Sequence, residues 1–273
     1  MASVFLIGDP VAHSLSPAMQ NAAFAALGLP HRYELLRTEE GDLPATIARL
    51  RGEDVLGANV TIPHKERVAR LLDATEEEAL RIGAVNTIFK RAGALRGDNT
   101  DGIGFAAALA ERGLEVAGRR VLVLGAGGAA RACVGQLLRA GASVAIANRT
   151  PSRAQAVRAA MRDLPAATGD ALSVAAWPGP DALARYDVLV NATALGMHGE
   201  DVLPGVPLRE GLAVVDIVAI AAETPLIAHA RALGRVAVDG LLMLLHQGAQ
   251  AFRLWTGVDA PLTAMRATLP RPV

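Results

Sequence analysis

The chain of 273 residues has little cysteine, few aromatic residues and no excess of either charge. A single cysteine, Cys133, excludes an internal disulfide framework and a cysteine-based zinc site, so we expect no bound metal. It also fits a reducing, cytoplasmic setting. The 27 basic residues equal the 27 acidic ones, and only 3% of residues are aromatic. Nucleic-acid binding needs a basic face or stacking aromatics, so no nucleic-acid partner is expected.

Long apolar segments are also missing. No apolar run approaches the ~18 residues that a bilayer span requires, and residues 2–8 form too short a run, without preceding basic residues, for a secretion signal. We therefore expect no membrane partner. Hydrophobic residues nevertheless make up 52% of the chain, which is enough for a packed core in one large domain or two small ones. The sequence says little about oligomeric state, and a monomer or a homodimer is expected.

Lysine is the rarest charged residue. Only Lys65 and Lys90 accompany 25 arginines, a bias that indicates the base composition of the coding sequence. A lysine kept against such a bias is a candidate for a role that arginine cannot fill, because arginine stays protonated whereas a desolvated lysine can release its proton.

The elements predicted from apolar periodicity alternate between strand and helix. Strands are predicted over residues 2–8, 31–38, 55–61, 85–89, 94–97, 120–124, 143–147, 187–191, 213–217 and 235–238. Helices are predicted from Ser16, as N-cap, to Gly28, over 43–51, from Pro63 onward, and over 75–81, 100–113, 128–141, 152–162, 226–233, 240–255 and 260–269. The segment 163–186 gives no clear pattern. This alternation predicts an α/β fold with parallel sheets and right-handed crossovers.

A glycine-rich turn follows the predicted strand 120–124. The run Gly125-Ala126-Gly127-Gly128-Ala129-Ala130 matches G-x-G-x-x-G/A between a strand and a helix. The first glycine makes the turn, the second lets the backbone approach a pyrophosphate, and the helix N-terminus offers free N–H groups. We expect a dinucleotide site here rather than a plain glycine turn.

The next strand ends in Asn148-Arg149-Thr150, and Arg153 follows closely. Sites that prefer NAD place an acidic residue at this tip for the ribose 2′-hydroxyl, and none is present. Guanidinium groups suit the 2′-phosphate of NADP, although two solvated arginines at a helix start are the alternative reading. The following strand ends in Asn191-Ala192-Thr193, and we expect Thr193 near the nicotinamide half of the cofactor.

Polar clusters in the first hundred residues suggest a substrate site. Ser14 and Ser16 could grip a carboxylate or merely cap a helix. Thr61 lies on the same strand face as Asn59, and Lys65 is expected in the first turn of the next helix, where it opposes the helix dipole. Asp101 reads equally as an N-cap. If Lys65 and Asp101 meet, they form a pair able to move a proton to and from a hydroxyl oxygen.

Several of these segments, taken in order, resemble the shikimate dehydrogenase family. The matching segments are Ser14-Leu15-Ser16, Asn59 to Lys65, Ala84-Val85-Asn86-Thr87, Gly97 to Gly102, Gly125 to Gly128, Asn148-Arg149-Thr150, Asn191-Ala192-Thr193 and Asp239-Gly240. They run over nearly the whole chain and are highly specific as a set.

The resemblance implies a substrate-binding domain over residues 1–102 and 239–273, with C-terminal helices returning to it, and a Rossmann NADP-binding domain over 103–238. It implies reversible, NADP-dependent oxidation of shikimate to 3-dehydroshikimate by hydride transfer, within chorismate and aromatic amino acid biosynthesis. It further implies that Lys65 and Asp101 are catalytic. The residues it implies for substrate binding are Ser14, Ser16, Thr61, Asn86 and Gln247, besides Asp101.

One position departs from the family pattern. The family usually carries a tyrosine three residues after the aspartate that matches Asp216, and this chain has Ala219 there. The loss of one hydrogen-bond partner typically costs ~0.5–1.5 kcal/mol, so recognition could be weakened or redirected. A paralogue acting on a relative such as quinate, and a non-catalytic NADP-binding sensor, are therefore kept as alternatives.

Overall fold

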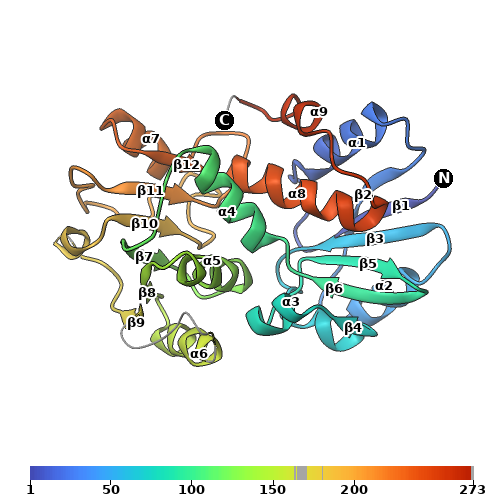
Figure 1. The fold of residues 1–273 in the computed structure, drawn as a ribbon, viewed down its shortest axis with the longest axis horizontal. Coiled ribbons are helices and arrows are strands. Elements are labelled where there is room, and N and C mark those ends of the chain that lie inside the picture. The colour runs from blue at the N-terminus through green and yellow to red at the C-terminus, as the bar shows by residue number, and fades with distance from the viewer. Residues whose placement is uncertain (163, 165–170, 180, 272–273) are drawn as a thin grey trace. The chain divides into compact units, whose positions relative to one another are not determined.

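The computed structural model describes residues 1–162, 164, 171–179 and 181–271. The chain forms two compact units. Among the described residues, one unit, which we call the terminal unit, contains Met1–Gly104 and residues 244–271, and the other, the inserted unit, contains Phe105–Met243. Each unit is built on its own six-stranded sheet (Figure 1).

The sheet of the terminal unit is mixed. Its strand order is β2-β1-β3-β5-β6-β4, with β1 (Ser3–Gly8), β2 (Arg32–Arg37), β3 (Val55–Val60), β4 (Ala74–Thr75), β5 (Thr87–Arg91) and β6 (Ala94–Asp98). Strand β1 runs parallel to both β2 and β3, whereas β5 runs antiparallel to β3 and β6.

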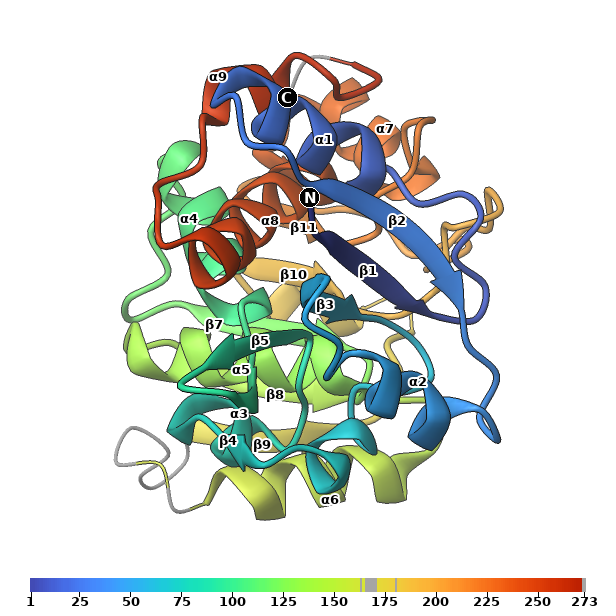
Figure 2. The same cartoon turned by 90° about the vertical axis from the view of Figure 1, so that its right-hand side faces the viewer.

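Helices cover both faces of this sheet. Helix α1 (Ser16–Ala26), the later part of α8 (Gly240–Thr256) and α9 (Leu262–Arg266) pack on one face, through a core that includes Phe24, Phe252 and Met265. Helix α2 (Leu43–Arg49), the short 3₁₀ helix η1 (Val68–Leu71) and α3 (Glu77–Ile82) pack on the other (Figure 2). Apolar residues of β1 alternate between the two cores, as the twofold periodicity of a strand requires.

The sheet of the inserted unit is parallel throughout. Its order is β12-β11-β10-β7-β8-β9, with β7 (Arg120–Leu124), β8 (Ser143–Ala147), β9 (Leu172–Ala175), β10 (Val188–Asn191), β11 (Ala213–Asp216) and β12 (Ala237–Asp239). Counted from β7, this is the strand order 6-5-4-1-2-3 of dinucleotide-binding folds. Their ligand lies at the switch point, which here falls between β7 and β10.

This sheet is also covered on both faces. Helix α4 (Asp101–Glu111) contributes its later turns to one face, together with α5 (Gly128–Arg139) and α6 (Pro151–Met161). The 3₁₀ helix η3 (Ala182–Arg185), the segment 202–212 and α7 (Pro225–Ala232) cover the other. Burial on both sides explains why these strands read as unbroken apolar runs.

The α/β fold expected from the sequence is confirmed, with three local corrections. The expectation of parallel sheets fails at β5, which runs antiparallel to β3. The pairing of β5 with β6 around Ala92-Gly93 is the one that the sequence predicts for residues 85–89 and 94–97. The helix predicted from Pro63 is wrong, because residues 62–67 form turns and only η1 follows. Strand β4 was not predicted. The unreadable segment holds β9 and η3, and its residues 163, 165–170 and 180 lie outside the described part.

Among the described residues, no helix combines the length and the apolar character that crossing a membrane demands. Within the same part of the chain, no three His, Cys, Asp or Glu side chains gather in a way that could hold a metal ion.

Candidate functional site

The glycine-rich loop lies at the switch point of the inserted sheet. Gly125 has φ of 113°, and a Cβ there would stand 2.5 Å from the carbonyl oxygen of Ala192, so only glycine fits where the loops after β7 and β10 meet. A Cβ at Gly127 would meet open space. Helix α5 then begins at Gly128 with no side chain capping its first amides. The open backbone at the glycines and the uncapped N–H groups of α5 suit the binding of a pyrophosphate at this edge of the sheet.

The end of β8 carries the residues expected at the adenosine side. The Asn148 side-chain amide donates to the carbonyl of Thr150 at 2.9 Å, which shapes the turn into α6. Arg149 and Arg153 are both exposed, and the guanidinium group of neither forms a hydrogen bond or an ion pair with another described residue. Two unengaged guanidinium groups with no carboxylate at the strand tip fit the extra phosphate of NADP.

A buried polar network joins the ends of β10 and β11. The side-chain oxygen of Asn191 accepts hydrogen bonds from the backbone N–H and the hydroxyl of Thr193, at 3.1 and 2.7 Å. The Asn191 amide donates to the Asp216 carboxylate at 2.9 Å. Burial raises the pKa of Asp216 to about 6. Sequence reasoning singled out Thr193 but missed Asp216 as a functional candidate, and the only available signal was a polar residue ending an apolar strand.

The terminal unit brings Lys65 and Asp101 together. The Lys65 ammonium lies 2.5 Å from a carboxylate oxygen of Asp101, and the two side chains are only 16% and 6% exposed. Lys65 does not enter a helix as expected. Its turn follows β3, and its carbonyl accepts from the backbone N–H of Val85 at 2.8 Å. Asp101 is the first residue of α4, and Asn99 accepts its backbone N–H at 3.0 Å. The pair can therefore exchange a proton with a hydroxyl placed beside it.

Asn86 connects this pair to the rest of the polar cluster. Its side-chain amide donates to the second Asp101 oxygen at 2.8 Å and to the Thr100 hydroxyl at 3.0 Å. The oxygen of Gln247, on α8, lies 3.4 Å from that amide. Gly104 permits this approach of α8, since a Cβ there would stand 2.6 Å from the Cβ of Gln247. Residues that are distant along the chain thus form one cluster inside the terminal unit.

The remaining predicted substrate residues lie in the same unit. The Ser14 hydroxyl accepts from the backbone N–H of Ser16 at 3.2 Å. The expectation that Ser16 is an N-cap is wrong, because it is the first residue of α1, which Leu15 precedes without a side-chain cap. Thr61 directly follows β3 and is partly exposed. The Thr61 hydroxyl makes no hydrogen bond to another described residue, and the Ser14 hydroxyl accepts one but donates none within the described part, so both can still donate to a ligand.

Tyr33 is a buried member of this unit that the sequence did not single out. Its hydroxyl donates to the side-chain oxygen of Asn59 at 2.8 Å, and burial raises the pKa of the phenol. Asn59 in turn donates to the carbonyl of Asn86 and the hydroxyl of Thr87. The two residues thereby fix the strand β3 against the loop that carries Asn86.

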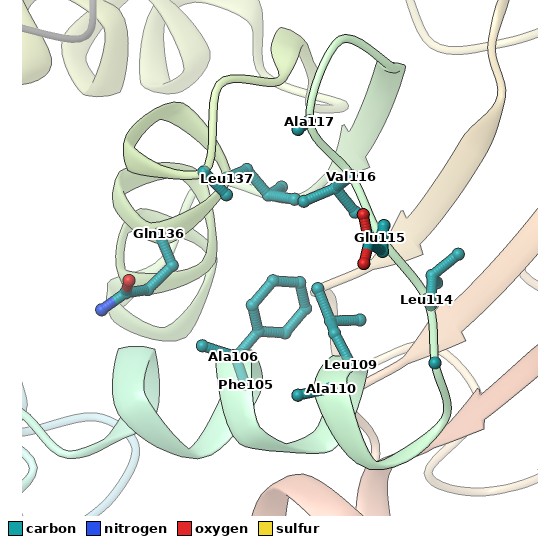
Figure 3. Close-up of a pocket in the computed structure, with 12 residues that line it drawn as sticks. Phe105, Ala106, Leu109, Ala110, Leu114, Glu115, Val116, Ala117, Gln136 and Leu137 are labelled. Atoms are coloured by element: carbon teal, nitrogen blue, oxygen red, sulfur yellow. The ribbon is translucent and has the colours of Figure 1, made fainter.

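A separate apolar cavity of about 390 Å³ lies in the inserted unit (Figure 3). Its lining includes Phe105 and Leu109 of α4, Val116 of the following loop, and Leu137 of α5. Leu137 lies near the C-terminal end of α5, whereas the glycine-rich loop precedes the N-terminus of this helix. None of the predicted site residues lines the cavity, so it belongs to neither the cofactor loop nor the polar cluster.

Comparisons with known proteins agree along the chain. Residues 6–88 match the family model described as shikimate dehydrogenase substrate binding domain, residues 108–198 match shikimate / quinate 5-dehydrogenase, and residues 240–269 match shikimate 5′-dehydrogenase C-terminal domain. The shikimate dehydrogenase (NADP(+)) of Rubrobacter xylanophilus is 49% identical over 272 residues, covering 97% of this chain and 94% of that protein.

Solved structures agree with these relatives. Shikimate 5-dehydrogenase of Thermus thermophilus, crystallised with NADP(H) and shikimate, has 39% identity and a TM-score of 0.86 over 100% of both chains. Quinate dehydrogenase of Corynebacterium glutamicum, in complex with NAD, has 32% identity and a TM-score of 0.85 over 98% of both chains. With relatives this similar over almost its entire length, the chain belongs to the shikimate dehydrogenase family.

Proposed function

We propose that the protein catalyses the reversible, NADP-dependent oxidation of shikimate to 3-dehydroshikimate, a step of chorismate and aromatic amino acid biosynthesis. One observation carries the proposal, namely the buried contact of 2.5 Å between Lys65 and Asp101 inside a cluster that also holds Asn86 and Gln247. Family membership supports the same reaction, since the curated relatives of 43–49% identity are named shikimate dehydrogenase (NADP(+)).

The proton step falls to Lys65. In the direction of oxidation, its uncharged amine accepts the proton of the reacting hydroxyl, while the hydride leaves the carbon that bears it and the C=O bond forms. Asp101 holds the Lys65 nitrogen and orients the hydroxyl, and Asn86 fixes the carboxylate from its other oxygen. In the reverse direction the resulting ammonium returns the proton. An arginine would keep the charge but could not serve, because it does not release its proton.

Substrate binding is assigned to the terminal unit. The hydroxyls of Ser14 and Ser16 would hold the carboxylate of shikimate, and Thr61, Asn86, Asp101 and Gln247 would hold the ring hydroxyls. Support for this assignment comes from their position in one unit and from the hydroxyl groups of Ser14 and Thr61, which donate to no other described residue.

Cofactor binding is assigned to the inserted unit. The backbone of the loop Gly125 to Ala129 would hold the pyrophosphate, and Asn148, Arg149, Thr150 and Arg153 the adenosine ribose with its phosphate. Thr193 would contact the nicotinamide half. When bound, NADP⁺ supplies the hydride acceptor. Exposed arginines with no acidic residue at the end of β8 favour NADP over NAD.

A second candidate reaction is the oxidation of quinate. Two observations favour keeping it: the structural similarity to a quinate dehydrogenase, and alanine at position 219, where no phenolic hydroxyl can reach a substrate. Quinate differs from shikimate in one hydroxyl and one ring double bond, so a small change in the site suffices to alter the preference.

The setting that we propose is cytoplasmic, as a monomer or a homodimer, without nucleic-acid or membrane partners. The chain has one cysteine, the buried Cys133, and so can form no internal disulfide, which agrees with a reducing compartment.

The test crosses NADP⁺ and NAD⁺ with shikimate and quinate and follows the absorbance of the reduced nicotinamide. The highest kcat/KM is expected with NADP⁺ and shikimate. A higher kcat/KM with quinate would replace the substrate assignment. No turnover in any combination, with NADP⁺ still bound in calorimetry, would reject the enzyme in favour of a sensor.

A further inference from the structure

Three neighbouring strands of the inserted sheet end in buried polar residues. Asn191, Asp216 and Asp239 are the last residues of β10, β11 and β12, and the strand register places them side by side. None is more than 1% exposed. Burying two carboxylates and an amide in one row is unfavourable unless each finds partners, so their contacts indicate what the row does.

Asp216 is the centre of this row because three separate segments donate to its carboxylate. One oxygen accepts from the Asn191 amide at 2.9 Å and from the backbone N–H of Val218 at 3.1 Å. The other accepts from the hydroxyl of Thr224 at 2.7 Å. Thr224 is the N-cap of α7. The carboxylate thus ties together β10, the loop after β11 and the start of α7.

Asn191 extends the connection into the loop after β10. Its amide also donates to the carbonyl of Leu195 at 3.0 Å, and its oxygen receives the backbone N–H and hydroxyl of Thr193. The Thr193 hydroxyl accepts from the backbone N–H of Leu195. A change at Asp216 therefore reaches Thr193 through a single side chain.

The strand order places these loops beneath the nicotinamide half of the cofactor. In a dinucleotide fold the pyrophosphate lies at the loop after the first strand, here β7, and the adenosine ribose at the end of the second, here β8. The other half of the molecule must then extend over the ends of β10 and β11. The segments 192–196 and 217–219 are the ones that follow those strands.

We propose that Asp216 is a positioning residue for the nicotinamide half of the cofactor, its ionised carboxylate holding segments 192–196 and 217–219 in the conformation that receives the ring. This rests on the proposed function in taking the cofactor to be NADP(H). Asp216 itself does not touch the reacting atoms in this role.

The charge matters because two of the three donors have no alternative. The Asn191 amide and the Val218 N–H can only donate, and hydrogen bonds to an ionised acceptor are about twice as strong as those to a neutral one. The Thr224 hydroxyl can rotate and accept instead. Protonation of Asp216 would thus keep the fold but loosen the two contacts that hold the loops.

The surroundings place this protonation within an accessible pH range. Burial is the largest cause that raises the pKa of Asp216, and the negative charge of Asp239 on β12 adds to it. The hydrogen bonds from Thr224, Val218 and Asn191 lower the pKa, and the net result is a value of about 6. Other ionisable groups on the flanking segments are exposed or paired: His198 and His229 are exposed, and Glu223 pairs with Arg231. The carboxylate of Glu200 accepts from the backbone N–H groups of His198 and Gly196, both at 3.0 Å, and these bonds hold its pKa below the usual value.

The experiment compares wild type with Asp216→Asn, which resembles the protonated carboxyl in shape and charge. The dissociation constant of NADPH is measured by fluorescence from pH 5 to 8, after thermal melting has shown that the variant is folded. At pH 8 the variant is expected to bind about fivefold more weakly, the effect of two weakened hydrogen bonds. At pH 5 the ratio of the two constants is expected to approach one, and taking the ratio cancels the titration of the 2′-phosphate of NADPH.

Asp239→Asn is the second variant. It removes the neighbouring negative charge and leaves Asp216 in place, so the wild-type transition near pH 6 should move to lower pH. In turnover assays with saturating NADP⁺, Asp216→Asn should lower kcat and leave the KM for shikimate unchanged, since the predicted substrate residues lie in the other unit.

A ratio of dissociation constants that stays at one across the pH range would overturn the positioning role, as would an Asp239→Asn transition at the wild-type pH. These binding measurements do not depend on turnover. Wild-type protein that binds NADPH but oxidises no shikimate would refute the proposed function and leave the Asp216 test intact.

Discussion

Replacing Gly104 by alanine tests whether the close contact between α4 and α8 places Gln247. A Cβ at position 104 would stand 2.6 Å from the Cβ of Gln247, 2.7 Å from its backbone nitrogen and 2.9 Å from its Cα. Ordinary contacts between such atoms exceed about 3.5 Å, so α8 must shift by roughly 1 Å at this point. Two of the three atoms are backbone, which no rotamer change can move aside.

Two effects of opposite sign decide the stability of the variant. Alanine in a helix interior is favoured over glycine by about 1 kcal/mol, whereas overpacking a tight contact costs about 1–3 kcal/mol. The net change is expected to lower the free energy of unfolding by about 0–2 kcal/mol. The same shift moves the Gln247 oxygen from Asn86 and Thr100, each 3.4 Å away. Loss of one hydrogen bond to substrate corresponds to about a two- to twelvefold rise in the KM for shikimate.

Gly135 provides a matched control. It lies in the middle of α5, and a Cβ there would have only the Arg139 guanidinium nearby, at 3.9 Å. Gly135→Ala is expected to raise the free energy of unfolding by up to about 1 kcal/mol with an unchanged KM. Urea unfolding and steady-state kinetics measure both quantities. If Gly104→Ala behaves like Gly135→Ala in both assays, the contact does not position Gln247 and the reasoning is refuted.

Three other perturbations test the site and the buried carboxylate. Lys65→Arg keeps a cation beside Asp101 but should lower kcat for shikimate oxidation about 10²- to 10⁴-fold. A normal kcat in steady-state assays would show that Lys65 does not transfer the proton. Arg149→Ala should raise the KM for NADP⁺ about tenfold or more and leave the KM for NAD⁺ nearly unchanged, and Arg153→Ala is expected to do the same. Equal effects on the two cofactors would disprove recognition of the 2′-phosphate. Because the folded-state pKa of Asp216 is raised to about 6, the native state binds its proton more tightly, and the stability this gives is lost as pH rises from about 4 to 6. Relative to Asp216→Asn, the wild-type free energy of unfolding, measured with urea, should fall by up to about 3 kcal/mol across that window. The same pH dependence in both proteins would contradict the burial argument.

Much of the fold could be predicted because its strands are buried on both faces. Strands β7 and β8 are found within the bounds that their apolar runs indicate, Arg120–Leu124 and Ser143–Ala147. The prediction failed after β3, where helix-compatible residues follow Pro63. There the ring of His64 bonds to the carbonyl of Thr38 at 2.7 Å, and the carbonyl of Lys65 accepts from Val85 instead of from a helical partner. Both partners are distant in sequence, so local propensity could not indicate them.

In the candidate site, too, local patterns identified some residues, whereas contacts between distant segments could not be predicted. Reasoning from residue types selected Lys65 and Asp101 as a pair able to move a proton if they meet, because a rare lysine and a polar helix start are visible locally. It could not place Gln247 beside Asn86, since the whole inserted unit separates them along the chain. Only the resemblance to a family supplied that residue. The link from Asn191 through Asp216 to Thr224 was equally hidden, because it depends on the register of neighbouring strands.

The terminal unit is built from two separate segments of the chain, and this affects the order in which the two units are completed during synthesis. The inserted unit is one continuous segment, Phe105–Met243, whereas the terminal unit also needs the residues from Leu244 onward. Its core pairs Phe24 and Tyr33, made early, with Phe252 and Trp255, made last. During synthesis the inserted unit is therefore complete while the terminal unit still lacks about half of one core. Nascent chains stalled just after Met243 should accordingly bind NADPH but expose the apolar face that the rest of α8 later covers.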